Sequence, residues 1–213
     1  MKGLFITFEG TEGCGKSTQI SRLAERLRAA GREVRLLREP GGTPIGEEIR
    51  HTLKHSSANA AMTPEAELLL INASRAQLVR EVIRPALEAG EVVVCDRFYD
   101  STIAYQGYGR QLNLDLVRAI VDVAVGETRP DLTLLLLVPT VVSAERMRQR
   151  QSTLPFARDR FEEAERSFFD RVDLGYQAIA ADDPGRVRAV DACGSIEAVG
   201  EWVWRRVAPF LQA

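Results

Sequence analysis

The sequence predicts an α/β fold, a three-layer α/β/α sandwich built on a five-stranded parallel sheet. Short apolar segments alternate with longer segments of helical periodicity along the chain, as in parallel α/β proteins. Residues 132–138 are apolar except for Thr133, which is typical of a parallel strand covered on both faces. A glycine-rich loop joins the first expected strand to the first expected helix.

The five expected strands are short apolar segments at residues 3–8, 33–37, 91–95, 132–138 and 186–190. Thr63 and Pro64 supply a cap and a first turn for one helix, and Gly31 and Gly90 end two others. Pro85 should kink or split the long third helix, because proline lacks the N–H that a helix interior needs. The expected helices cover residues 16–30, 43–54, 64–89, 98–125 with a break near 107–109, 141–150, 162–181 and 195–211.

The composition predicts a globular chain with a single domain, residues 1–213, because 45% of its residues are hydrophobic and 27% are charged. Its net charge of −2 does not favour nucleic acid as a partner. Three cysteines, an odd number far apart, argue against a disulfide framework and favour a reducing compartment. No segment has the pattern of a membrane span or signal peptide, so we expect a cytoplasmic protein that does not enter membranes.

The glycine-rich loop fits the phosphate-binding pattern G-x-x-x-x-G-K-[ST], which predicts a P-loop NTPase type of fold. Glycines let backbone N–H groups surround a phosphate, and the following helix adds the positive end of its dipole. Lys16 should reach the β- and γ-phosphates, and the Ser17 hydroxyl should bind Mg²⁺. A chance glycine turn is the alternative, which the flanking strand and helix disfavour. The expected ATP-binding residues are Gly10, Thr11, Glu12, Gly13, Cys14, Gly15, Lys16, Ser17 and Thr18.

A P-loop predicts triphosphate binding but leaves the reaction open. The chain has no Asn-Lys-x-Asp element of the kind that reads guanine in GTPases, and it is short for a motor ATPase. A short chain with inserted helices and an arginine-rich segment favours a kinase of small metabolites. A nucleotide-dependent switch without turnover is the alternative from a different class.

Six short motifs, taken together and in this order, strongly resemble the thymidylate kinase family over nearly the whole chain. They are Phe8-Glu9-Gly10, Arg38-Glu39-Pro40-Gly41-Gly42-Thr43, Ser74-Arg75-Ala76-Gln77, Asp96-Arg97-Phe98, Ser101-Thr102 and Ala104-Tyr105-Gln106-Gly107. The resemblance implies transfer of the γ-phosphate of ATP, with Mg²⁺, to dTMP, giving dTDP for dTTP synthesis. It also implies a homodimer. A P-loop kinase acting on another nucleoside monophosphate or a nucleoside is the alternative.

The same resemblance assigns expected roles to phosphate-binding and acidic residues. Arg38 matches the position that contacts the acceptor phosphate, and Arg97 matches the one that bridges this phosphate and the transferred group. Glu12 matches a carboxylate that contacts the acceptor sugar. Glu9 and Asp96 match acidic positions near the metal and phosphates, although Asp96 could instead be a structural cap.

Roles toward the nucleoside part of the acceptor also follow from the resemblance. Arg75 matches the residue that bonds the thymine carbonyl, Thr102 the partner of the ring N–H, and Tyr105 the gate against a ribose 2′-hydroxyl. Arg75 could instead be a solvated helix residue, and Tyr105 could be part of the core. Ile71 stands where relatives often have a phenylalanine stacked on thymine, so an aromatic contact is lost. The other expected acceptor-binding residues are Pro40, Ser101 and Gln106.

An arginine-rich segment at about residues 146–161 resembles the lid of this family. With no arginine inside the P-loop, Arg148 and Arg150 are the expected catalytic lid residues, beside Lys16 and Arg97. A solvated basic helix face is the alternative.

His51 and His55 have a metal-capable spacing, but a solvated face is the simpler interpretation. The resemblance further predicts a cis peptide at Glu39-Pro40, and a dimer face on the third helix formed by Ala66, Leu69, Leu70 and Ala73.

Overall fold

The structure is a computed structural model that describes residues 3–153 and 165–211, with side chains described only up to residue 149 in the first range. Five parallel strands form one sheet in the order β2-β3-β1-β4-β5. Each strand lies within one residue of its predicted ends, which confirms the predicted sheet. The strands are β1 Leu4–Glu9, β2 Val34–Arg38, β3 Val92–Asp96, β4 Leu132–Leu137 and β5 Val187–Asp191.

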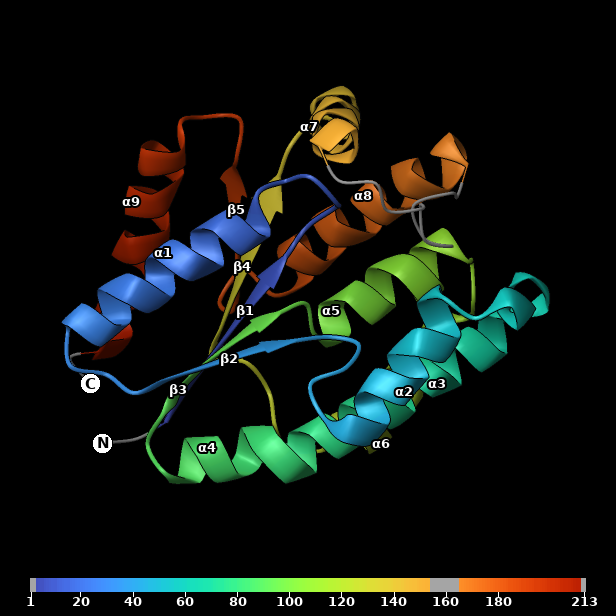
Figure 1. The fold of residues 1–213 in the computed structure, drawn as a ribbon, viewed down its shortest axis with the longest axis horizontal. Coiled ribbons are helices and arrows are strands. Elements are labelled where there is room, and N and C mark those ends of the chain that lie inside the picture. Colours follow the sequence, from blue (N-terminus) through green and yellow to red (C-terminus); the bar gives the residue numbers. More distant parts are fainter. Residues whose placement is uncertain (1–2, 154–164, 212–213) are drawn as a thin grey trace.

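Helices cover both faces of the sheet and complete the three predicted layers (Figure 1). Leu4, Ile6 and Phe8 of β1 pack toward α1 and α9, whereas Phe5 packs on the opposite side toward α3 and α6. This alternation explains why the strand is apolar throughout, since both of its faces are buried. The α-helices are α1 Lys16–Ala29, α2 Pro44–Lys54, α3 Pro64–Leu78, α4 Arg84–Glu88, α5 Tyr99–Thr102, α6 Leu114–Val125, α7 Thr140–Thr153, α8 Arg166–Asp182 and α9 Ile196–Val207.

Two predicted helices are interrupted near the places where a break was expected, at Pro85 and near 107–109, and both interruptions are π-helical. The long helix from Pro64 is divided by a π-helical turn, η2 Val79–Ile83, just before Pro85. Proline cannot donate to the carbonyl four residues earlier and crowds it, and a wider turn accommodates this. The segment expected to be helical from 98 to 125 contains α5, the π-helical segment η3 Ile103–Gly109, a loop and then α6. Two 3₁₀ turns, η1 Ser57–Ala61 and η4 Ala208–Leu211, complete the described elements.

The carboxyl ends of β1 and β3 lie side by side, because these strands are neighbours in the sheet. The connection after β1 leads toward β2 and the one after β3 leads across to β4, so the two loops diverge here. Ligands of open parallel sheets bind at such a divergence. Within the described ranges, no helix is both long enough and apolar enough to cross a membrane.

Candidate active site

The loop between β1 and α1 has a backbone that only glycine permits at two positions. A Cβ on Gly10 would lie 2.3 Å from the Leu136 carbonyl oxygen, in a residue whose φ is 130°. Gly15, the residue before α1, has a φ of 99°, in the left-handed region. Side chains other than hydrogen are disfavoured there. The glycines of the motif therefore set the path of the loop and bring it tightly against β4.

Lys16 folds back over the loop that precedes it. Its Nζ donates to the carbonyl oxygens of Gly10 and Thr11, both at 3.0 Å, and the side chain is buried. Ser17 and Thr18 follow at the exposed beginning of α1. A buried ammonium beside a helix N-terminus makes a site for an anion such as a polyphosphate. The geometry agrees with the predicted P-loop.

Arg97 follows β3 and has a φ of 69°, in the left-handed region where a non-glycine residue is strained. Its Nη2 lies 3.0 Å from Glu12 Oε1 and 3.3 Å from the Tyr105 hydroxyl. The charge of Arg97, with those of Lys16 and Lys54, holds the pKa of Glu12 far below its usual range despite burial. Three predicted site residues, Glu12, Arg97 and Tyr105, are therefore in direct contact.

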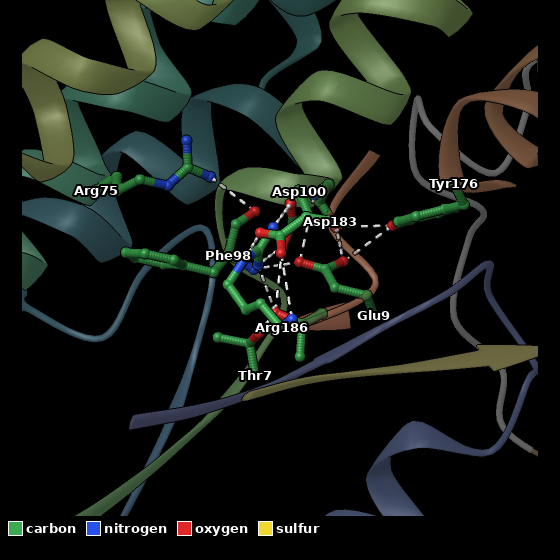
Figure 2. Close-up of polar contacts among 10 residues, drawn as sticks. Thr7, Glu9, Arg75, Phe98, Asp100, Tyr176, Asp183 and Arg186 are labelled. Carbon is green, nitrogen blue, oxygen red and sulfur yellow. Dashed lines mark hydrogen bonds and ion pairs between the residues drawn. The ribbon is translucent and has the colours of Figure 1, made fainter. Parts of the chain in front are cut away.

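Glu9 is fully buried beneath this group, and Figure 2 shows its carboxylate pointing toward Tyr176 of α8. Oε1 accepts from the backbone N–H groups of Phe98 (2.8 Å) and Ser101 (3.3 Å). Oε2 accepts from the hydroxyls of Ser101 (2.6 Å) and Tyr176 (3.0 Å). Burial, with the charge of Asp100, raises the pKa of Glu9 to about 7. Four donors of its own chain bond this carboxylate, so the predicted metal role of Glu9 would require one of these bonds to be replaced.

Asp96 is a better candidate for the metal. It is the last residue of β3, and its Oδ1 is buried without a hydrogen-bond partner among the described residues. A buried carboxylate oxygen left unpaired is costly unless a ligand satisfies it. Hard cations such as Mg²⁺ prefer oxygen ligands. The unpaired oxygen of Asp96 therefore has the chemistry that a Mg²⁺ ligand requires.

The loop after β2 contains the predicted cis peptide, Glu39-Pro40, which the structure confirms. Arg75 of α3 holds this loop from below, with Nε and Nη2 at 2.8 and 2.7 Å from Glu39 Oε2. Nη1 of the same arginine donates to Asn72 Oδ1 (2.8 Å) and Thr102 Oγ1 (2.9 Å). Arg75 is 1% exposed, so the alternative of a solvated helix arginine is wrong.

Arg38 lies at the same loop but remains half-exposed. Its Nη2 is 2.9 Å from Glu47 Oε2, and Glu47 Oε1 accepts from the Gly42 N–H at 2.7 Å. The Gly41 N–H donates to Ser74 Oγ at 3.1 Å. The loop is thus fixed on both sides, with Arg38 at its solvent edge, where an acceptor phosphate can reach it.

Of the remaining residues expected to bind the acceptor, Ile71, Thr102 and Gln106 are buried, whereas Pro40 and Ser101 are partly exposed. Ile71 and Thr102 are 7% and 1% exposed. Gln106 donates through Nε2 to Glu67 Oε1 at 2.8 Å. The Tyr105 ring is edge-on to Phe168, with centroids 5.9 Å apart. Tyr105 therefore contacts both the core and Arg97.

The lid arginines differ from the expectation where they are described. Arg148 is 68% exposed and pairs with Glu145 at 3.1 Å, away from the P-loop. Arg146 is instead the arginine that reaches it, with Nη2 3.2 Å from the Ala192 carbonyl oxygen and Nη1 3.5 Å from that of Gly13. The Arg150 side chain, and residues 154–161 of the predicted lid, lie outside the described residues.

Sequence reasoning missed three buried groups that support the site: Glu39 as the partner of Arg75, Glu67 as the partner of Gln106, and Tyr176 as a partner of Glu9 and Arg97. Glu39 and Glu67 carry a weak signal, since charged residues inside apolar patterns need a partner when buried. Tyr176 carries none, because a tyrosine on an amphipathic helix is ordinary. The two histidines at 51 and 55 are exposed, with ring centroids 6.0 Å apart.

A P-loop at the end of β1, an arginine after the adjacent β3 and the buried Arg75–Thr102 contact beside them are the arrangement expected of an ATP-dependent phosphotransferase. The sequence profile of the family described as thymidylate kinase matches residues 8–203. The chain therefore belongs to the thymidylate kinase family, an ATP-dependent nucleoside monophosphate kinase family.

Individual relatives agree with the family assignment. The chain is 48% identical over 200 residues to a thymidylate kinase of Geobacter sulfurreducens, covering 92% of each chain. It is 51% identical over 192 residues to one of Pseudomonas fluorescens, covering 90% of this chain and 89% of the other. The crystal structure of thymidylate kinase from Ehrlichia chaffeensis matches with a TM-score of 0.78 at 32% identity, covering 98% of this chain and 99% of that one. The resemblance found in the sequence motifs is confirmed.

Proposed function

We propose that this enzyme transfers the γ-phosphoryl group of ATP to dTMP, giving ADP and dTDP. The observation that carries the proposal is the convergence of Lys16, Glu12, Arg97 and the Arg75–Thr102 pair at the carboxyl ends of β1 and β3. The first three lie where phosphates are expected. In the last pair, Arg75 also bonds Glu39, Asn72 and the Phe98 carbonyl oxygen, so a bound base would have to replace one of these acceptors. Thymine presents a carbonyl next to a ring N–H, which Arg75 and Thr102 can recognise together.

The chemistry requires positioning and charge stabilisation from the protein. The acceptor phosphate oxygen is already anionic, so no protein nucleophile or strong base is needed. Lys16 neutralises charge on the β- and γ-phosphates, and Arg97 bridges the acceptor phosphate and the transferred group. Arg38 binds the acceptor phosphate from the solvent side. Preorganised cations of this kind stabilise the charge that spreads over the transferred phosphoryl.

The metal and the lid complete the proposed site. Ser17 and Asp96 would hold Mg²⁺, which neutralises charge on the phosphates of ATP when bound. Arg146, placed between Gly13 and Ala192, is the lid arginine that we assign to the nucleotide, with Arg150 as a second candidate. Closure over the phosphates excludes water, which would otherwise hydrolyse ATP.

A product analysis tests the proposed reaction. Purified enzyme is incubated with ATP, Mg²⁺ and dTMP, and the nucleotides are separated by ion-exchange chromatography. Equal amounts of ADP and dTDP should form, and neither should form at a comparable rate when dTMP is left out. Nucleotide binding without dTMP-dependent ADP release would instead support a switch without turnover.

We also propose a homodimer formed through α3 and α6, which pack together. Large apolar side chains are exposed on both helices: Leu69 is 56% exposed, Leu116 50% and Val123 78%. A second copy of the chain would remove these apolar side chains from water, which favours association. Light scattering should give twice the chain mass, and Leu69→Arg should give a monomer.

For location we propose the cytoplasm, where ATP is available and the unpaired Cys14, Cys95 and Cys193 remain reduced.

A further inference from the structure

The hydroxyls of Ser101 and Tyr176 each lie between the carboxylate of Glu9 and the guanidinium of Arg97. Both lie within hydrogen-bond distance of Glu9 Oε2, at 2.6 and 3.0 Å. Both also lie near Arg97 Nη1, at 3.0 Å for Ser101 Oγ and 3.1 Å for the Tyr176 oxygen. The two hydroxyl oxygens are 2.9 Å apart. Four polar groups from β1, β3, α5 and α8 thus form one closed cluster.

The positions of the hydroxyl protons follow from counting donors. Each hydroxyl has one proton, and an ionised carboxylate only accepts. If both hydroxyl protons point to Glu9 Oε2, no proton lies between the Ser101 and Tyr176 oxygens, which are 2.9 Å apart. Both oxygens can then only accept hydrogen bonds. Arg97 Nη1 carries two hydrogens and faces both oxygens. Each hydrogen then meets one oxygen, and every polar atom of the cluster is satisfied.

We propose that Tyr176 is a positioning residue for Arg97: its hydroxyl, oriented by Glu9, fixes the Nη1 end of the guanidinium so that Nη2 faces the phosphate site. This inference rests on the proposed role of Arg97 in phosphoryl transfer. Nη2 is the end that lies beside Glu12 of the P-loop. A guanidinium is planar, so fixing one nitrogen with two acceptors fixes the direction of the other.

The surroundings hold the Tyr176 hydroxyl in place. The side chain is fully buried, and its ring is edge-on to that of Tyr105, with centroids 6.3 Å apart. Burial and the nearby Glu9 raise the pKa of the Tyr176 hydroxyl well above its usual range, so it keeps its proton. Figure 2 shows this hydroxyl reaching Glu9 from α8. A phenylalanine ring would fill the same space, so packing alone does not explain the hydroxyl of Tyr176.

The substitution Tyr176→Phe tests the role of this hydroxyl. It retains the ring but leaves one hydrogen of Arg97 Nη1 without an acceptor. We expect kcat to fall by about tenfold to a hundredfold, as for a lost bond to a charged group, while the KM for ATP changes less than about twofold. Tyr108→Phe is the matched control: Tyr108 packs against Gly175, next to Tyr176 in sequence, but lies outside the site. This control should retain wild-type kinetics.

A double-mutant cycle with Arg97→Lys distinguishes positioning from general stability. The lysine amine is a point charge without the planar fork, so the hydroxyl should no longer matter to turnover. Tyr176→Phe should then lower kcat by less than about twofold in the Arg97→Lys background. Equal losses in both backgrounds, or wild-type kinetics of Tyr176→Phe alone, would overturn the positioning role. Wild-type turnover of Arg97→Lys alone would instead refute the proposed function of Arg97.

Discussion

Arg97 and Glu12 form an ion pair that joins the end of β3 to the P-loop, with 3.0 Å between Nη2 and Oε1. The pair brings a carboxylate into a site built for phosphates, where a negative charge is unfavourable unless it is compensated. Arg97 supplies that compensation and lowers the pKa of Glu12. Under the proposed function, an acceptor phosphate that binds Arg97 would share this arginine with Glu12.

Lys16→Ala should abolish transfer while the protein remains folded. The described bonds of the ammonium all lie within the P-loop, to the Gly10 and Thr11 carbonyl oxygens at 3.0 Å and to Cys14 Sγ at 3.7 Å, so no contact between distant parts of the fold is lost with it. We expect turnover to fall by roughly a hundredfold or more, as for the loss of a group that stabilises transition-state charge. Arg22→Ala on the outer face of α1 is the control, because Arg22 forms an exposed pair with Glu197 at 3.7 Å. Wild-type turnover of Lys16→Ala would refute the P-loop assignment.

The fold was predictable because its signals are local. Strands covered on both faces are continuous apolar runs, and Thr63 caps α3 as the Thr63-Pro64 sequence predicts. The π-helical turns at Val79–Ile83 and Ile103–Gly109 were not predictable. One extra residue in a turn rotates the following side chains, yet the residues remain as apolar as in an α-helix.

The site was predictable only in part. Sequence motifs located Lys16, Arg75 and Arg97, since each lies in a short pattern. They did not locate Tyr176, which is 79 residues from Arg97 and meets it only through the packing of α8. Nor did they indicate the four hydrogen bonds to Glu9, because its donors come from distant parts of the chain.

Two glutamate–arginine pairs on the loop after β2 should differ strongly in how much they contribute to the free energy of unfolding. The Glu39–Arg75 pair has side chains 3% and 1% exposed, whereas Glu47–Arg38 has side chains 43% and 49% exposed. Removing one partner of a buried pair leaves an uncompensated charge and costs about 3–5 kcal/mol. Glu39→Ala should lower the free energy of unfolding by this amount.

Glu47→Ala should cost about 1 kcal/mol or less, since exposed pairs contribute little. Urea denaturation of both variants measures the difference. Glu39→Ala should also raise the KM for dTMP, because Arg75 loses the acceptor that orients it. Equal stability losses in the two variants would contradict the assignment of Glu39 as the structural partner of Arg75.

The raised pKa of Glu9 predicts a pH-dependent stability. An ordinary glutamate ionises near 4.5, and Glu9 in the folded protein at about 7. Between these two pH values Glu9 holds its proton in the folded state but has lost it in the unfolded state. The free energy of unfolding therefore falls as the pH rises through this range, and it stops falling above about pH 7. The total is on the order of 3 kcal/mol.

Glu9→Gln removes this titration. The free energy of unfolding of the wild type minus that of Glu9→Gln should therefore decrease between about pH 4.5 and pH 7 and then level off. Urea unfolding at several pH values measures it. A difference that stays constant over this range would show that Glu9 does not titrate there.

Tyr105 should determine the preference for deoxyribose. A ribose 2′-hydroxyl facing the ring would lack a partner, which costs about 1–3 kcal/mol and gives roughly a tenfold to hundredfold preference for the deoxy form. Tyr105→Ala should narrow this ratio of kcat/KM for dTMP and its ribonucleotide, mainly by improving the ribonucleotide. Tyr105→Phe keeps the ring and should keep the ratio. If Tyr105 is only part of the core, Tyr105→Ala will lose stability and act equally poorly on both nucleotides.

The acceptor preference of the enzyme tests the central claim most directly. Ile71 has no aromatic ring, so in the proposed site the recognition of thymine is assigned to Arg75 and Thr102, which bond each other. The measurement is kcat/KM for dTMP, dUMP, dCMP, dAMP and dGMP in a coupled assay of ADP formation. We expect dTMP to be the best acceptor, with dCMP at least about tenfold worse because its amino group meets the donors of Arg75. A higher kcat/KM for any acceptor other than dTMP would contradict the account.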